Sequence, residues 1–185
     1  MAKVYAMIAN GSEEVECLAV VDVLKRCGIE VSLVSVHEER EIVSSHGIRI
    51  QADEIASQAA FSDGDAIFLP GGMPGSEHLY NCAPLREALK KAHAEGRRIA
   101  AICAAPAVVL GRLGYLQGRR ATCYPGFEKD LLGAEHTGEG VVTDGNITTA
   151  RGLGYALDLG LELGGLLAGL DVAAKVKSQI QYDQV

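Results

Sequence analysis

The sequence predicts an α/β fold in which helices cover both faces of a mostly parallel sheet. Short apolar, β-branched runs alternate with segments of helical periodicity along the whole chain, which is typical of parallel strands joined by crossover helices. The chain has 185 residues, of which 48% are hydrophobic and 22% charged, so it can form a substantial core. No linker, internal repeat or low-complexity tract is visible. We therefore expect a single domain over residues 1–185.

The first half of the chain predicts two strands separated by a helix. The run at 3–9 is apolar and partly β-branched, and apolar residues in 18–24 recur at near-helical spacing until Gly28, a typical helix C-cap. The segment 29–36 alternates as a strand does. Weaker candidates are two strands within 41–52 and a short helix at 53–60.

The second half repeats this alternation. A strand at 65–70 ends at the breaker cluster PGGMPG, and a helix at 83–96 has a proline near its start and a closing glycine. Asp144-Gly145-Asn146 is a hairpin signal between two further strands. The remaining expected elements are strands at 98–103 and 120–125 and helices at 105–116, 154–169 and 171–180.

Charge and hydropathy exclude several classes of partner. A net charge of −7 argues against electrostatic binding of nucleic acid or of anionic lipid. The apolar stretch near 154–169 contains Asp158, Glu162 and several glycines, which favours a buried helix over a membrane span. No secretory signal is visible at the start of the sequence. We expect a cytoplasmic protein.

The cysteines and histidines do not form a metal-binding motif or a disulfide pattern. The five cysteines are an odd number without C-x-x-C spacing, and the five histidines are dispersed. Reduced thiols fit this usage better than disulfides or structural zinc. We expect neither a metal nor a cofactor.

In parallel α/β sheets, functional groups gather beyond the carboxyl ends of the strands. This rule selects loops that hold three glutamates, a Gly-Gly pair, Cys103, Tyr124 and Arg151. The loops are 10–16, 70–76, 103–106, 123–127 and 151–154.

Cys103 lies where a predicted strand gives way to a predicted helix. Helix N-termini stabilise anions, so a thiol there becomes a nucleophilic thiolate more readily. The strand-to-helix turn resembles a nucleophile elbow in which Ala101 and Ala105 replace the usual glycines. The alternative is an inert core cysteine.

The glycine and glutamate loops supply possible partners for that thiol. Gly71-Gly72 could present backbone N–H groups to an oxyanion, although a plain loop is the alternative. The segment lacks the Gly-Lys-Ser/Thr of a phosphate-binding loop. The glutamates 13, 14 and 16 could simply favour the helix start behind a Ser12 cap. Glu16, one turn in, could instead point at the thiol, where a like charge raises its pKa and lets it donate or move a proton.

Four motifs in order, GSEEVE, LPGGMPG, AAICAAPAVVL and TARGLG, are similar to the ThiJ/PfpI superfamily and, within it, to the DJ-1 branch. The similarity extends over essentially the whole chain. The resemblance implies a flavodoxin-like three-layer sandwich of the class I glutamine amidotransferase type, and a homodimer. It also implies that Cys103 is a nucleophilic, oxidisable cysteine, that Glu16 is its protonated partner, and that Gly72 and Ala104 offer N–H groups to an oxyanion.

The chain also departs from the pattern of that branch. Tyr124 occupies the place of a histidine near the cysteine, and His46 that of an arginine contributed across the dimer. Arg26, at the end of the first helix, matches a basic residue kept near the site, and the resemblance implies an anion or substrate pocket near the dimer interface at Arg26 and His46. Ala104 replaces the histidine of protease-like members, which argues against a peptidase. Since a phenol shuttles protons poorly at neutral pH, Tyr124 would orient a carbonyl and Glu16 would carry most proton transfer.

The resemblance implies a cysteine-dependent glyoxalase III or deglycase that acts on methylglyoxal, glyoxal and their early adducts on proteins or nucleotides, without a cofactor. A redox-sensing stress chaperone, in which Cys103 oxidises to a sulfinate, is the alternative. A catalytically silent relative is a third possibility. Cys17 and Cys123, beside Glu16 and Tyr124, could be resolving thiols or buried core residues.

Overall fold

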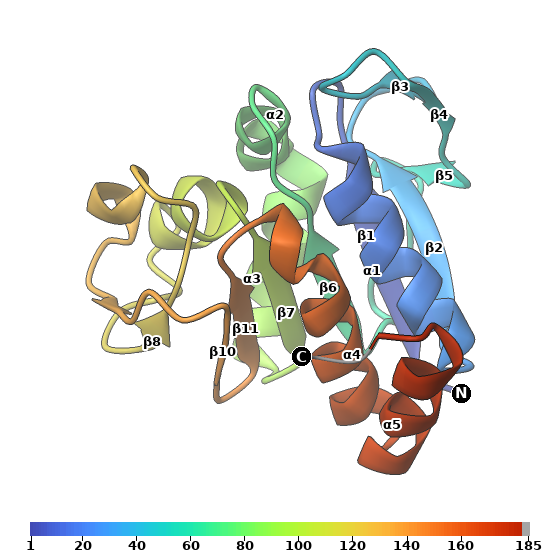
Figure 1. Cartoon of the computed structure of the whole chain (residues 1–185). Helices are drawn as coiled ribbons and strands as arrows, with labels where there is room; N and C mark the ends of the chain where they lie inside the picture. The colour runs from blue at the N-terminus through green and yellow to red at the C-terminus, as the bar shows by residue number, and fades with distance from the viewer. Residues whose placement is uncertain (183–185) are drawn as a thin grey trace.

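A computed structural model describes residues 1–182 and shows a seven-stranded sheet at the centre of the chain (Figure 1). The strand order is β10-β11-β7-β6-β1-β2-β5, and every pairing is parallel except that of β10 with β11. The strands are β1 (Lys3–Ile8), β2 (Glu30–Ser35), β5 (Glu54–Ile55), β6 (Ala66–Leu69), β7 (Arg98–Ile102), β10 (Val141–Asp144) and β11 (Ile147–Ala150). The parallel strands therefore end at one edge of the sheet.

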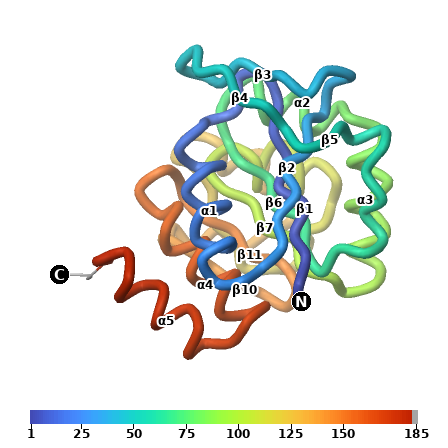
Figure 2. Tube along the Cα trace, turned by 90° about the vertical axis from the view of Figure 1, so that its right-hand side faces the viewer, coloured from blue at the N-terminus to red at the C-terminus, as the bar shows by residue number. Residues whose placement is uncertain are grey.

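Helices pack on both faces of this sheet (Figures 1 and 2). One face carries α1 (Glu14–Arg26), α4 (Ala156–Ala168) and α5 (Leu170–Gln179), with α4 packed between α1 and α5. The other face carries α2 (Gly75–Asn81), α3 (Ala83–Ala94) and the short helix η1 (Pro106–Gly111). The three-layer α/β architecture predicted from the sequence is confirmed.

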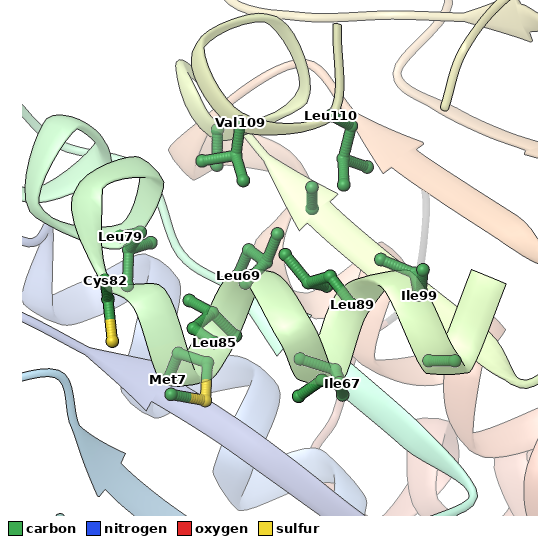
Figure 3. Packing of buried hydrophobic residues seen from close by; sticks show 14 of the residues in the cluster. Met7, Ile67, Leu69, Leu79, Cys82, Leu85, Leu89, Ile99, Val109 and Leu110 are labelled. Atoms are coloured by element: carbon green, nitrogen blue, oxygen red, sulfur yellow. The ribbon is translucent and has the colours of Figure 1, made fainter. Parts of the chain in front are cut away.

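Alternating strand residues divide the core into two halves. On the α3 face, Met7, Ile67 and Ile99 pack with Leu85 and Leu89 of the helix (Figure 3). On the opposite face, the neighbouring strand residues pack against α1 and α4; these include Ile8, Phe68, Ile102, Val20, Leu24 and Leu159. Since side chains alternate across a strand, the same short runs supply both halves.

Smaller elements border the sheet. The strands β3 (Glu41–Val43) and β4 (Arg49–Gln51) form an antiparallel pair, as the sequence predicts for 41–52. The strand expected at 120–125 is only β8 (Arg120–Ala121), which pairs with β9 (Glu135–His136). The remaining elements are two short 3-10 helices, η2 (Glu128–Asp130) and η3 (Leu153–Tyr155).

Several expected boundaries are confirmed. The helices α3, α4 and α5 lie within or next to the predicted ranges, and β10 and β11 form the predicted hairpin, in which Gly145 has φ +60°. Within residues 1–182, none of the helices combines the length and the apolarity that crossing a membrane requires.

Two local predictions are wrong, and one helix was not predicted. The helix expected at 53–60 is instead β5 followed by turns, because pairing with β2 overrides the helical propensity of that segment. The helix α2, which begins at Gly75, the last residue of the breaker cluster, was not predicted from the sequence. The helix expected at 105–116 is the six-residue π-helix η1. It ends where a Cβ on Gly111 would lie 2.1 Å from the Asp130 carbonyl oxygen.

Candidate active site

The loops selected by the carboxyl-end rule meet at one edge of the sheet. The Glu13 N–H donates to the Gly71 carbonyl (3.0 Å), which joins the loop after β1 to the loop after β6. The Cys103 N–H donates to the Ala150 carbonyl (2.9 Å), and the Tyr124 N–H donates to the Cys103 carbonyl (2.8 Å). The main chain alone therefore assembles the predicted loops around Cys103.

Cys103 lies in a strained turn at the end of β7. Its φ of +64° is in the left-handed region, which a residue with a side chain seldom adopts. Ala101 and Ala105 on either side are fully buried and small enough for this turn. The predicted elbow geometry is thus present. Cys103 is half-buried, whereas the other four cysteines are buried, and all five are free thiols.

Glu16 is a buried carboxyl in contact with that thiol. It lies in the first turn of α1 with a side chain that is 1% exposed, and its Oε2 accepts a hydrogen bond from the Gly71 N–H (3.0 Å). It also shares hydrogen bonds with the Cys103 thiol and the Leu153 N–H. Burial, helped by the negative charge of Glu13, raises the pKa of Glu16 to about 7 despite these hydrogen bonds. Glu16 can therefore hold a proton near neutral pH.

The two glycines allow this approach. A Cβ on Gly71 would lie 2.5 Å from both Cys103 Cβ and Glu16 Oε2, so no side chain fits between thiol and carboxyl. Gly72 has φ +87°, and a Cβ there would lie 2.5 Å from the Glu13 nitrogen. The N–H groups of Gly72 and Ala104 form hydrogen bonds with the Cys103 sulfur. The predicted N–H donors are therefore directed at the sulfur.

The electrostatics correct one sequence-based prediction. The helix N-terminus was expected to make Cys103 a thiolate, but burial and the ionised Glu16 carboxylate raise the pKa of the Cys103 thiol, against the N–H groups of Gly72 and Ala104. The following helix, η1, is only six residues long and contributes little dipole. A sulfur anion is favoured when the proton resides on Glu16, which then donates to the sulfur.

The other two glutamates of the first loop have different roles. Glu13, and not Ser12 as predicted, is the N-cap of α1: its Oε2 accepts from the Glu16 N–H (2.6 Å), while the Ser12 hydroxyl accepts from the Ala9 N–H. Glu14 Oε1 lies 2.9 Å from His46 Nδ1. Donor atoms of Glu13, Glu14 and His46 lie within 4.8 Å of one another, which is close enough to hold a metal ion.

Two predicted site residues do not reach Cys103 within the chain. Arg26 is exposed at the far end of α1 and pairs with Asp22 (2.7 Å), about 15 Å along the helix from Glu16. His46 contacts Glu14, two residues before Glu16 in α1. A pocket near a dimer interface that holds Arg26 and His46 stays a prediction. Tyr124 adjoins Cys103 through its backbone, while its ring packs over Gly152, where a Cβ would lie 3.2 Å from Tyr124 Cδ2.

A hollow of about 300 Å³, open to solvent, lies next to Tyr124, which adjoins Cys103; it was not predicted from the sequence. It is lined by Tyr124, Pro125, Arg151, Gly152, Leu153, Gly154 and Tyr155. The carboxyl-end rule selected loop 151–154, but no motif pointed to Tyr155.

Comparisons with known proteins show the family to which the chain belongs. Residues 2–164 match the family model described as the DJ-1/PfpI family. The chain belongs to this family. Protein dj-1beta of Drosophila melanogaster is 33% identical over 92% of this chain and 91% of its own length. Protein DJ-1 homologs B and A of Arabidopsis thaliana are each 40% identical, but this chain spans only 41% and 44% of their length.

Solved structures of family members superimpose closely on this chain. An oxidised DJ-1 of Toxoplasma gondii has a TM-score of 0.96 and 36% identity, and each chain is covered completely. A DJ-1 superfamily protein of Salmonella typhimurium, solved as a cysteine-to-alanine mutant, has a TM-score of 0.95 and 34% identity, again over both whole chains. The fold class and the family predicted from the sequence are thus confirmed.

Proposed function

We propose that this chain is a cysteine-dependent glyoxalase that converts 2-oxoaldehydes such as methylglyoxal and glyoxal to 2-hydroxy acids without glutathione, and that also acts on their early adducts. The observation that carries the proposal is the contact between Cys103 and Glu16. A nucleophilic sulfur touches a buried carboxyl whose pKa is raised to about 7, and two backbone N–H groups face the sulfur. A nucleophile, a proton carrier and oxyanion donors are what addition to a carbonyl requires.

The proposed reaction needs no external oxidant. The Cys103 sulfur bonds to the aldehyde carbon, and the proton of Glu16 passes to the resulting oxyanion to give a hemithioacetal. The Glu16 carboxylate then removes the hydrogen from that carbon, and an enediol forms. Reprotonation at the former ketone carbon leaves a thioester, so one carbon is oxidised while its neighbour is reduced. Water cleaves the C–S bond and releases the 2-hydroxy acid and the thiol.

The test is lactate formation from methylglyoxal by the purified protein, with D- and L-lactate assayed separately. We expect one enantiomer to predominate and Cys103→Ser to abolish its formation. A chiral product requires a proton delivered from one side, which the fixed position of Glu16 provides. Lactate formed equally by Cys103→Ser, or none formed by the wild type, would overturn the proposal and favour a catalytically silent relative.

Direct deglycation requires a separate measurement, because adduct formation with thiols and amines is reversible. A preformed adduct is mixed with the protein, and lactate release is compared with spontaneous dissociation of the adduct. Direct action on the adduct predicts release faster than dissociation. Release limited to the dissociation rate means that only free methylglyoxal is consumed.

A second candidate function is redox sensing, since Cys103 alone among the five cysteines is not buried. Two equivalents of hydrogen peroxide would oxidise the sulfur to a sulfinate and be reduced to water. Glu16 and the N–H groups of Gly72 and Ala104 would hold the sulfinate oxygens. Mass spectrometry after mild peroxide should show two added oxygens at Cys103 alone, whereas uniform oxidation of all five thiols would exclude sensing.

The proposed assembly is a homodimer formed through α1. Val15 and Leu18 are one turn apart and exposed on this helix, and the neighbouring β3–β4 hairpin exposes Val43 and Ile48. Such a contiguous apolar face is typical of an interface. Arg26 could reach a site only across such an interface.

Sedimentation of the purified chain tests this assembly. Leu18→Glu buries a charge in the proposed interface and should give monomers, while Leu170→Glu, at a side chain 77% exposed on α5, should leave the dimer intact. A wild-type monomer, or dimers of both variants, would contradict the interface.

A further inference from the structure

We infer that the hollow next to Tyr124 is a subsite for an aryl or other large apolar group on the substrate, so that the preferred substrates are arylated 2-oxoaldehydes and not methylglyoxal itself. This inference rests on the proposed function and concerns the part of the substrate that does not react.

The walls of the hollow are continuous with the reacting groups. Tyr124 at one side is tied to Cys103 by a backbone hydrogen bond of 2.8 Å. Leu153 at the other side donates its backbone N–H to the carboxyl of Glu16. On this inference, a substrate whose carbonyl carbon is at the sulfur extends its substituent past Tyr124 and Leu153 into the hollow.

The lining is apolar and open to solvent. The side chains of Tyr124, Leu153 and Tyr155 are 50%, 48% and 37% exposed, which makes them three of the large apolar residues that the fold leaves uncovered. They project from two short segments on adjoining loops. Uncovered aromatic side chains around a concavity are typical of small-molecule sites.

The rings of Tyr124 and Tyr155 each pack against a glycine. The Tyr124 ring lies against Gly152. A Cβ on Gly140 would lie 2.1 Å from Tyr155 Cε1, so the Tyr155 ring packs directly on the backbone of Gly140. Rings held in this way bind a flat group with little loss of side-chain entropy.

The volume of the hollow indicates the size of the substrate group that it can hold. A cavity of about 150 Å³ is enough to bind benzene. The hollow, at about 300 Å³, accommodates a phenyl ring, whereas the single methyl of methylglyoxal leaves nearly all of it unfilled. Removing a ring from water against apolar walls is favourable. The hollow thus favours substrates with a large apolar group over the smallest ones.

The experiment compares phenylglyoxal with methylglyoxal by kcat/KM in the wild type, Tyr155→Ala and Tyr155→Phe. We expect Tyr155→Ala to lower kcat/KM for phenylglyoxal about tenfold through KM, and to leave methylglyoxal unchanged within about twofold. Tyr155→Phe retains the ring and should behave as the wild type. Leu170→Ala, which removes an exposed side chain outside the hollow, is the matched control.

Equal losses for both substrates, or none for either, would overturn the inference while the proposed reaction stands. A binding measurement separates the two failures. If the wild type turns over neither dicarbonyl, the proposed function falls, and the hollow is then judged by titration with mandelate and lactate. Tighter binding of mandelate that Tyr155→Ala abolishes supports the hollow, and equal binding of both acids overturns it.

Discussion

Cys17 and Cys103 are both neighbours of Glu16, but their surroundings differ. Cys17 is fully buried, and burial, followed by the charges of Glu13 and Glu16, raises the pKa of its thiol to about 12. The Cys17 thiol donates a hydrogen bond to the Met7 carbonyl (3.9 Å) and lies in the hydrophobic core. Burial and Glu16 also raise the pKa of Cys103, but this sulfur meets two N–H groups and is partly open to solvent. Proximity to the Glu16 carboxyl is therefore not what distinguishes the reactive thiol. Cys103 differs from Cys17 in its partial exposure to solvent and in the two N–H groups directed at its sulfur.

The largest expected effect separates the two thiols directly. Cys103→Ala should reduce lactate formation at least about 1000-fold, because the nucleophile is lost. Cys17→Ala should change it by no more than about threefold and lower the free energy of unfolding by about 1 kcal/mol, through lost packing. Both are measured by the lactate assay and by urea denaturation. Comparable losses of activity in the two variants would contradict the assignment of Cys103, and not Cys17, as the nucleophile.

The next effect concerns the proton on Glu16. Its pKa in the folded chain is about 7, against an ordinary value of 4.5, so folding favours the protonated form. That contribution is fully present below pH 4.5 and is lost as the pH rises through 7. Relative to Glu16→Gln, the wild type should lose about 3 kcal/mol of unfolding free energy over this range.

Urea denaturation of both proteins between pH 4.5 and 8 measures this difference. Glu39→Gln, at an exposed position, should show no such trend relative to the wild type. Parallel curves for the wild type and Glu16→Gln would mean that Glu16 ionises in the fold as easily as in the unfolded chain.

A slightly smaller effect separates thiolate formation from proton transfer. Glu16→Gln retains an N–H that can donate to the sulfur, so iodoacetamide should label Cys103 within about threefold of the wild-type rate. Turnover should fall about 100-fold, since an amide carries no transferable proton. Glu14→Gln, at a buried carboxyl that pairs with His46, is the control and should spare both rates.

The smallest effect concerns the phenol of Tyr124. Its ring lies on Gly152 and its backbone supports Cys103, so the hydroxyl should add little. Tyr124→Phe should lower kcat/KM for methylglyoxal by no more than about threefold. A loss above about tenfold would assign the hydroxyl a direct part in orienting the carbonyl.

The sequence predicted the parts of this molecule that depend on local pattern. Strand runs, capped helices and the carboxyl-end rule located the sheet and the loop that holds Cys103. Glu16 was predicted because a carboxyl one turn into α1 points back to that edge. The pKa of the thiol, however, depends on burial and on a carboxylate 87 positions away in the chain, so an argument from the following helix alone gave the wrong direction.

Contacts between distant segments account for the other errors. Glu13 replaces Ser12 as the N-cap because the Ser12 hydroxyl accepts from Ala9. Arg26 lies at the far end of α1 from Glu16, and a pocket near a dimer interface stays a prediction for it. The hollow required Tyr155 to meet Tyr124 across two loops, which no spacing along the chain encodes.

Gly71 has no side chain, so its backbone lies directly between the Cys103 side chain and the Glu16 carboxyl. Cys103 follows β7 and Glu16 lies in the first turn of α1, so the main-chain distance between them changes only if the helix moves relative to the sheet. Movement of α1 away from the sheet would separate the carboxyl from the sulfur and change the rate at which Cys103 is alkylated.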